Sequence, residues 1–278
     1  MEKTSIKINV LYPSMSKAEK RIADWLKGNP NEILALSIVE LAEKCECSEA
    51  TIVRFAKRLG LGGYQDLKIS LAQESETAIT NTKIAKGDTP YEIYGKVCND
   101  VYCALERTKN SLDEKQLLAA ADRIADSGRV IIFGLGNSAS VATDMSHKLL
   151  RAGCNSVAYS DNHMQVIAAS HLTENDTVVG ISHSGSSRDI VDALKIAKDH
   201  GATTVCITNK GKSPVTKVSD IVLETSAEET KYSILGLSSR IAQLSIVDTL
   251  YYYVVYRNTE TAIESIKETE RSLLSKKY

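Results

Sequence analysis

The sequence is poor in residues that interrupt regular structure, with 15 glycines and 4 prolines among 278 residues. This scarcity favours long helices over the many short strands and turns of an all-β protein. The chain also lacks an apolar run long enough for a membrane span or a signal peptide, so we expect a cytoplasmic protein with no membrane partner. Its 43% hydrophobic and 25% charged residues are an ordinary globular composition, which excludes disordered and collagen-like classes.

Neither charge of one sign nor cysteine is concentrated in the chain. Lys and Arg number 34 and Asp and Glu 35, so DNA binding would depend on a local basic patch rather than on an overall positive field. The six cysteines are scattered, which is typical of reduced thiols rather than of a disulfide framework. Cys45 and Cys47 lie one residue apart with no second pair, which falls short of a zinc site, and we expect neither a metal nor a cofactor.

Two hydrophobic periodicities divide the chain. Between Ser16 and Gln73 the apolar residues recur at helical spacing, whereas between Arg129 and Glu224 short β-branched runs alternate with helical stretches. The second pattern predicts an α/β fold, a doubly wound five-stranded parallel sheet of flavodoxin-like order 2-1-3-4-5. The strands are expected at residues 130–133, 156–159, 177–181, 204–207 and 221–223.

These patterns predict a helix-turn-helix domain at residues 1–76, a linker and connecting helix at 77–110, and the α/β domain at 111–278. Capping boxes, in which a Ser side chain and a Glu three residues later satisfy each other's backbone donors, mark expected helix starts. The three pairs are Ser16 with Glu19, Ser37 with Glu40, and Ser111 with Glu114.

The segment from Ser37 to Phe55 has the pattern of a helix, a tight turn and a second helix capped by Ser48. Glu46 falls in the turn, where Gly or Asn would relieve strain more readily. The exposed start of the second helix and the basic residues after it are the candidates for DNA contact: Ser48, Glu49, Thr51, Arg54, Lys57, Arg58 and Lys68. From spacing alone, a helical hairpin that binds nothing remains an alternative.

The residues after the turn are more specific. An Arg-Phe pair at 54–55, a Leu-Gly at 59–60, a Gly-Tyr at 63–64 and a following Lys68 closely resemble the N-terminal domain of the RpiR family of bacterial transcriptional regulators. Gly60 is expected to end the second helix in a left-handed cap, and Gly63 and Tyr64 to open the next helix. The resemblance implies operator DNA as a partner.

In the α/β region, two strand-to-helix loops are rich in serine and glycine, residues 134–140 after the first strand and 182–189 after the third. Strands one and three are neighbours in the expected order, and the helices after them go to opposite faces, so the two loops should meet. Helix N-termini and serine hydroxyls suit a phosphate monoester without a lysine. The candidate ligand residues are Asn137, Ser138, Ser182, His183, Ser184 and Ser187.

Other interpretations of these loops stay open but are weaker. Each serine could simply cap a helix, and His183 could be a spectator. The spacing Gly134-x-Gly136 permits NAD but leaves the second loop unexplained, and the P-loop Gly-Lys-Ser/Thr is missing. Residues 180–184 resemble a nucleophile elbow, but Ser184 replaces its last glycine and no histidine follows His200.

The second loop resembles the Ser-x-Ser-Gly-x-Thr/Ser motif of the SIS (sugar isomerase) domain, a phosphosugar-binding module, and Ser138 matches that domain's first-loop serine. The resemblance continues through residues 207–209, 213–214 and 239–244. Together the two resemblances imply a transcriptional regulator of sugar metabolism, controlled by a phosphorylated sugar effector and acting as a homodimer or a dimer of dimers.

A phosphosugar isomerase with an accessory helical domain is the alternative function. Isomerisation needs a positioned base, and after the fifth strand only Glu228 and Glu229 could conceivably serve, so we predict no catalytic residue. Later in the chain, the tyrosine-rich run at residues 251–256 is expected to lie in the core, with a subunit contact as the second interpretation.

Overall fold

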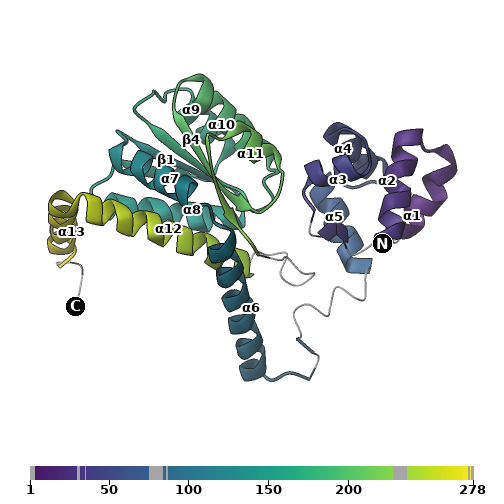
Figure 1. Cartoon of the computed structure of the whole chain (residues 1–278), viewed down its shortest axis with the longest axis horizontal. Helices are drawn as coiled ribbons and strands as arrows, with labels where there is room; N and C mark the ends of the chain where they lie inside the picture. Colours follow the sequence, from purple (N-terminus) through teal and green to yellow (C-terminus); the bar gives the residue numbers. More distant parts are fainter. Residues whose placement is uncertain are drawn as a thin grey trace. The chain divides into compact units, whose positions relative to one another are not determined.

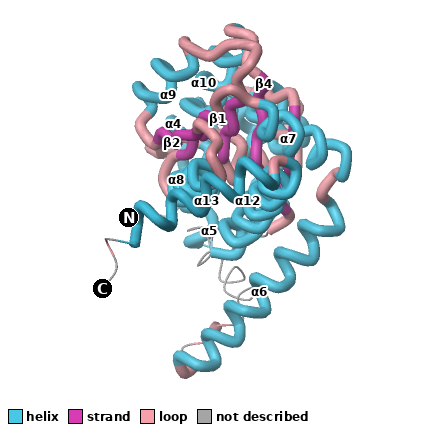
Figure 2. The backbone as a smooth tube through the Cα atoms, turned by 90° about the vertical axis from the view of Figure 1, so that its left-hand side faces the viewer, coloured by secondary structure: helices cyan, strands magenta, loops and turns pink. Residues whose placement is uncertain are grey.

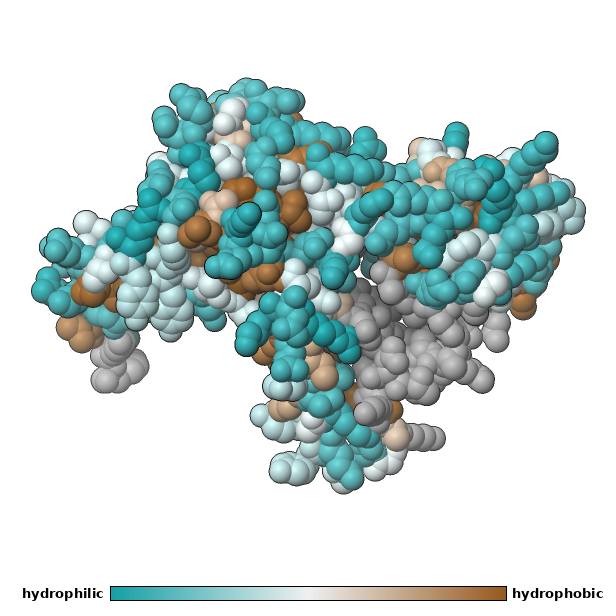
Figure 3. Space-filling model, viewed as in Figure 1, coloured by the Kyte–Doolittle hydropathy of each residue, from teal (hydrophilic) through white to brown (hydrophobic). Residues whose placement is uncertain are grey.

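The computed structural model describes residues 4–29, 32–34, 36–74, 84–85, 87–227, 237–274 and 276 (Figure 1). They form two compact units, a helical one that lies mostly before Tyr102 and an α/β one that lies mostly after it. No helix in these ranges is long and apolar enough to cross a membrane. The face seen in Figure 3 is mostly hydrophilic, with scattered apolar patches.

The helical unit packs short helices around one apolar core. Its helices are α1 (Thr4–Leu11), α2 (Lys17–Gly28), α3 (Ile38–Lys44), α4 (Glu49–Arg58) and α5 (Tyr64–Glu74), with 3₁₀ turns η1 (Tyr12–Ser14) and η2 (Glu32–Leu34). The capping boxes at Ser16 and Ser37 are confirmed. Helix α1 was not predicted. It packs on α5 and buries Ile8 in the core.

The turn between α3 and α4 is a helix C-cap of the Schellman type. Glu46 has φ 49°, the left-handed region that normally favours glycine. The amide of Cys47 donates to the carbonyl of Ala42 at 2.9 Å, and that of Glu46 to Glu43 at 3.1 Å. The prediction of a strained position at Glu46 is therefore confirmed, as is the left-handed cap at Gly60, where φ is 81°.

The α/β unit has the predicted topology. Its helices are α7 (Glu114–Asp126), α8 (Asn137–Arg151), α9 (Asn162–Ala169), α10 (Arg188–Asp199), α11 (Pro214–Val218), α12 (Leu237–Arg257) and α13 (Thr259–Leu274), and the boundary between the two units falls within α6 (Pro90–Ser111). The strands are β1 (Val130–Gly134), β2 (Ser156–Tyr159), β3 (Thr177–Ile181), β4 (Thr203–Asn209) and β5 (Ile221–Thr225). They pair in parallel in the order β2-β1-β3-β4-β5.

Two apolar layers cover the sheet, one on each face. Ile132 and its same-side neighbours pack with α7, α8 and α12, whereas Ile131 and Phe133 face the layer of α9, α10 and α11. Figure 2 shows the strands between α9 and α10 on one side and α8 and α12 on the other. The helices that follow β1 and β3 thus lie on opposite faces, as predicted.

Two sequence expectations about this unit were wrong. Ser111 does not cap α7 in a box with Glu114, because Ser111 ends α6 and the carboxylate of Asp113 accepts from the amide of Gln116 at 3.0 Å instead. The tyrosine run is not all core. Tyr252 and Tyr256 are 59% and 75% exposed, because residues four apart share one face of α12 and that face points outward.

Candidate functional site

The two serine-rich loops start side by side at one edge of the sheet. β1 and β3 are paired in register so that Gly134, the last residue of β1, lies opposite Ile181, the last residue of β3. Because the strands are parallel, both chains leave the sheet at the same level. The register therefore supports the prediction that the loops flank a single crevice.

The first loop brings the backbone of α8 close to the sheet. A Cβ atom on Gly134 would lie only 2.6 Å from the carbonyl oxygen of Ser138, so this close approach requires glycine. Gly136, with φ 55°, occupies the N-cap position of α8 and has no side chain to offer as a cap. Asn137 and Ser138 follow in the first turn of α8, the former exposed and the latter half-buried.

The second loop is a tight turn built from its own serines. Ser182 is buried, its hydroxyl donates to that of Ser187 at 3.2 Å, and its carbonyl accepts from the amide of Gly185 at 3.0 Å. The hydroxyl of Ser184 accepts from the amide of Ser186 at 3.3 Å. The loop thus gathers three predicted ligand hydroxyls, those of Ser182, Ser184 and Ser187, at the start of α10.

Residues of β4 and α11 fix the backbone of this loop, a role that we did not predict. The carbonyl of His183 accepts from the amide of Asn209 at 3.0 Å and from the hydroxyl of Thr208 at 3.4 Å. The amide of Val215 donates to the carbonyl of Gly185 at 2.9 Å. Only the resemblance at residues 207–209 drew attention to this segment, because the strand pattern by itself marks it as core.

Among the described residues, the helices that follow β1 and β3 begin without a side-chain cap, unlike five other helices that include α9, which begins at the same edge after β2. Side chains cap α2, α3, α4, α7 and α9 through Ser16, Ser37, Ser48, Asp113 and Asp161. In the part of the chain that the structure describes, neither α8 nor α10 has a side-chain cap: Gly136 has no side chain, and Ser187 bonds to Ser182. Serine capping therefore does not explain the second loop, and both positive helix ends remain available to an anion.

The second candidate site is α4, which follows the tight turn. Ser48 caps it, accepting from the amide of Thr51 at 3.3 Å, and Arg54 donates to the hydroxyl of Thr51 at 3.3 Å. Ile52 and Phe55 are fully buried beneath it. Because one face is anchored in the core, Ser48, Arg54 and Lys57 are left exposed on the other.

The remaining predicted DNA residues have partners inside the helical unit. Glu49 is half-buried in the first turn of α4, where a carboxylate stabilises the helix N-terminus. Lys68 donates to the carbonyl of Leu36 at 3.1 Å, and Arg58 donates to Ser14 and Glu19. Among the predicted basic contacts, Arg54 and Lys57 are thus the ones most accessible to phosphate.

The described residues contain no group of three or more His, Cys, Asp or Glu side chains arranged around a metal position. Cys45 is buried, and burial raises the pKa of its thiol to about 11. A thiol with so high a pKa stays protonated at neutral pH. Cys45 and the half-buried Cys47 pack in the core, as the spacing predicted for small hydrophobic residues.

Comparison with known families matches both units. Residues 3–78 match the helix-turn-helix domain of the rpiR family, and residues 123–253 match the SIS domain. The chain is 34% identical to a helix-turn-helix transcriptional regulator of Caldanaerobacter subterraneus over 97% of this chain and 96% of that protein. It is 31% identical to the transcriptional regulator RpiR of Escherichia coli K12 over 92% of this chain and 87% of that protein.

Solved structures share the fold. The NanR protein of Vibrio vulnificus, complexed with ManNAc-6P, superposes with a TM-score of 0.83 at 23% identity and covers 99% of both chains. The sugar isomerase domain of an RpiR transcription factor from Sphaerobacter thermophilus has a TM-score of 0.58 at 24% identity, covering 64% of this chain and 98% of that one. A helix-turn-helix unit joined to an SIS domain defines a DNA-binding transcriptional regulator. The chain belongs to the RpiR family.

Proposed function

We propose that this regulator binds a phosphorylated sugar at the paired loops after β1 and β3, and that the bound sugar alters its affinity for operator DNA. The absence of side-chain caps on α8 and α10, at adjoining ends of the sheet, carries this proposal for the residues that the structure describes. Two helix N-termini and several hydroxyls together can bind a phosphate dianion without a lysine.

The loop residues divide the recognition between them. The hydroxyls of Ser138, Ser182, Ser184 and Ser187 and the nearby backbone amides take the phosphate. Asn137 and His183, from the same two loops, reach the sugar hydroxyls. The NanR protein of Vibrio vulnificus, which has the same fold, is complexed with the phosphosugar ManNAc-6P, and this supports a ligand of that class here.

Calorimetry on the full chain tests the ligand site. We expect binding of one or more members of a panel of hexose and amino-sugar phosphates and none of the unphosphorylated parents. Ser138→Ala and Ser182→Ala should each weaken binding about tenfold, since a hydrogen bond to a charged group is lost. Ser140→Ala is the matched control, because the hydroxyl of Ser140 donates to the carbonyl of Asn137 at 2.7 Å, within its own helix. Equal affinity of phosphorylated and parent sugars would contradict the proposal.

We further propose that the bound sugar is an effector and not a substrate. The first carboxylate along α12, Asp248, is ion-paired with Lys148 of α8, so it is not an available base. Glu228 and Glu229 lie outside the described residues. The sugar phosphate that binds should be recovered unchanged when followed by NMR, and turnover would instead favour the isomerase.

For the DNA half, we propose that Ser48, Thr51, Arg54 and Lys57 face the operator. The chain, as a homodimer or a dimer of dimers, would present paired copies of α4 to an operator with two-fold symmetry. The test is a gel-shift with overlapping 30-base-pair duplexes (tiles) that cover the DNA upstream of the gene for this protein. One tile should be retarded. Arg54→Ala and Lys57→Ala should weaken that complex, and Lys217→Ala, an exposed lysine of the α/β unit, should not. Light scattering of the complex measures the number of copies.

A further inference from the structure

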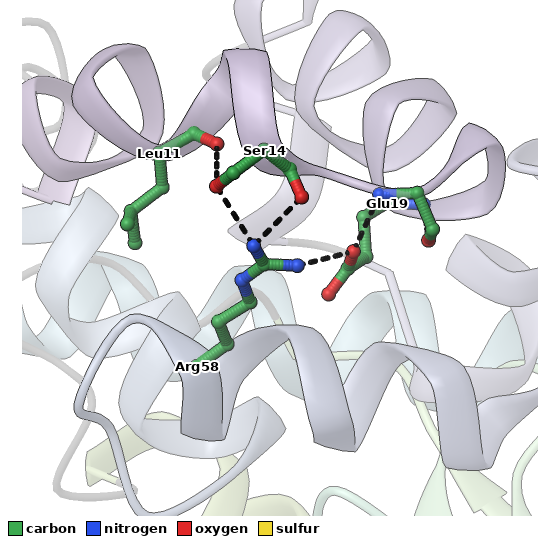
Figure 4. A network of polar contacts seen from close by, with 5 residues as sticks. Leu11, Ser14, Glu19 and Arg58 are labelled. Atoms are coloured by element: carbon green, nitrogen blue, oxygen red, sulfur yellow. Dashed lines mark hydrogen bonds and ion pairs between the residues drawn. The ribbon is translucent and has the colours of Figure 1, made fainter.

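The last turn of α4 is tied to the start of α2 by a single guanidinium group (Figure 4). Arg58 donates through Nη1 to the carboxylate of Glu19 at 2.7 Å. Through Nη2 it donates to both the carbonyl and the hydroxyl oxygen of Ser14, each at 2.8 Å. One arginine thus connects the end of α4 to both sides of the α2 N-cap.

The acceptors of Arg58 are themselves held in place. Glu19 also accepts from the amide of Ser16 at 2.8 Å as part of the capping box, and its side chain is 12% exposed. Partial burial on its own raises the pKa of Glu19, but the hydrogen bonds from Ser16 and Arg58 outweigh it and hold that pKa below its usual range. The hydroxyl of Ser14 donates to the carbonyl of Leu11 at 2.8 Å. Arg58 therefore binds a preformed site.

A second arginine acts on the turn that precedes α4. Arg21, one turn into α2, donates to the carbonyl of Glu46 at 2.6 Å, and its guanidinium lies 3.6 Å from the Glu46 carboxylate. Within the described residues, Glu46 is the one non-glycine residue with a positive φ, a conformation that costs about 1 kcal/mol or more. Arg21 thus holds the strained residue on which the direction of α4 depends.

We infer that the segment from Ser14 to Arg21 orients α4 for DNA, and that Arg21 and Arg58 are positioning residues rather than phosphate contacts. The inference rests on the DNA-binding role of α4 proposed above. Both ends of α4 contact this segment, which runs from the end of η1 into α2, and a change at either contact would rotate the side chains of Arg54 and Lys57 relative to a phosphate backbone. The fork of an arginine suits this task, because it bonds several fixed acceptors at once.

Salt dependence distinguishes positioning from phosphate contact. On the tile retarded by the full chain, Arg58→Ala and Arg58→Lys should each weaken binding about tenfold while leaving the slope of log K against log salt unchanged. Lysine keeps the charge but presents its donors from a single nitrogen, so it lacks the planar fork that reaches Glu19 and Ser14 at the same time. Lys57→Ala, the neighbouring control, should lower the slope by about one. A lowered slope for Arg58→Ala with normal binding by Arg58→Lys would overturn the inference for Arg58.

Rescue tests Arg21. Arg21→Ala should weaken DNA binding, and adding Glu46→Gly should restore it to within about twofold of the wild-type value, because glycine adopts a positive φ without support. In the Glu46→Gly background, Arg21→Ala should therefore weaken DNA binding only slightly. Equal losses in both backgrounds would overturn the positioning role of Arg21.

Hydrogen exchange tests whether Arg21 and Arg58 hold α4, independently of the DNA-binding role that the gel-shift tests. Arg21→Ala and Arg58→Ala should each accelerate amide exchange across residues 45–59, and Glu46→Gly should reverse the effect of Arg21→Ala. Unchanged exchange in both single variants would refute the positioning role of Arg21 and Arg58. Lys57→Ala should exchange like the wild type.

Discussion

Gly134 shows how one residue without a side chain allows the end of a strand to approach the first turn of the following helix. The position has no room for a Cβ atom, since the carbonyl oxygen of Ser138 and the side chain of Ala142 would lie within 3.0 Å of it. The strand needs glycine there for space and not for a left-handed backbone.

Gly134→Ala should therefore move the first turn of α8 away from β1. We expect a loss of about 1–3 kcal/mol in the free energy of unfolding, measured by urea denaturation, together with weaker phosphosugar binding. Gly128→Ala is the control, because its added Cβ would meet its nearest neighbour at 3.6 Å, an ordinary contact. Equal stability of the two variants would contradict the steric explanation.

Asp176, before β3, is a buried acid whose lowered pKa is expected to link the stability of the α/β unit to pH. Its carboxylate accepts from Arg129 at 3.0 and 2.7 Å and from the amide and hydroxyl of Thr173 at 2.8 and 2.9 Å. The hydrogen bond from Arg129 is the main cause that lowers its pKa. The folded pKa lies below the unfolded value of about 3.9, so the stabilisation is complete above that value and is lost as pH falls through the folded pKa.

Asp176→Asn should therefore cost about 2 kcal/mol at pH 7 and progressively less below pH of about 4. Urea unfolding of both proteins at a series of pH values measures the difference. A difference that stayed constant down to pH of about 2 would show that the charge of Asp176 contributes nothing.

At the scale of elements, helix starts divide into those that use a side-chain cap and those that do not. α7 belongs to the first kind through Asp113. Asp113→Ala should cost about 1 kcal/mol of stability, because an N-terminal amide loses its acceptor. Ser111→Ala should change stability by less than about 0.5 kcal/mol, since that hydroxyl only donates to Thr108 within α6. A larger loss for Ser111 than for Asp113 would restore the predicted capping box.

α8 and α10 belong to the second kind, and their stability comes from packing. Both bury a continuous apolar face, through Val141 and Met145 in α8 and Ile190 and Leu194 in α10. Because packing against the core stabilises both helices, the absence of a cap at their N-termini lowers the stability of the fold only slightly.

For the whole molecule, a formal net charge of −1 provides no general attraction to DNA. If a bound sugar changes the affinity for operator DNA, the change is a coupling free energy between the two sites. If the ligand changes the dissociation constant for the operator by some factor, saturating operator DNA must change the constant for the sugar phosphate by the same factor. Calorimetry with and without the operator duplex, beside gel-shifts with and without the sugar, checks this equality. Ser182→Ala should raise about tenfold the sugar concentration that gives half of the effect on DNA binding. An unchanged half-effect concentration would place the effector elsewhere.

Local patterns predicted most of the fold. The alternation after Arg129 predicted five parallel strands and their order, because strands buried on both faces are β-branched and their connections are right-handed crossovers. The capping boxes at Ser16 and Ser37 were recognisable because their partners are only three residues apart. Helix α1 could not be recognised from the sequence, because Ile6, Ile8 and Val10 alternate with polar residues. The helix depends instead on packing against α5.

The sequence by itself determined the chemistry available to this protein: serines at two strand ends, basic residues on one helix, and a non-glycine residue in the tight turn. Only the tertiary structure decided which of these groups are already engaged. It paired Arg58 with Glu19, aligned Gly134 with Ile181, and left α8 and α10 without side-chain caps. The physical reason is that such partners lie tens of residues apart along the chain, so no local pattern records them.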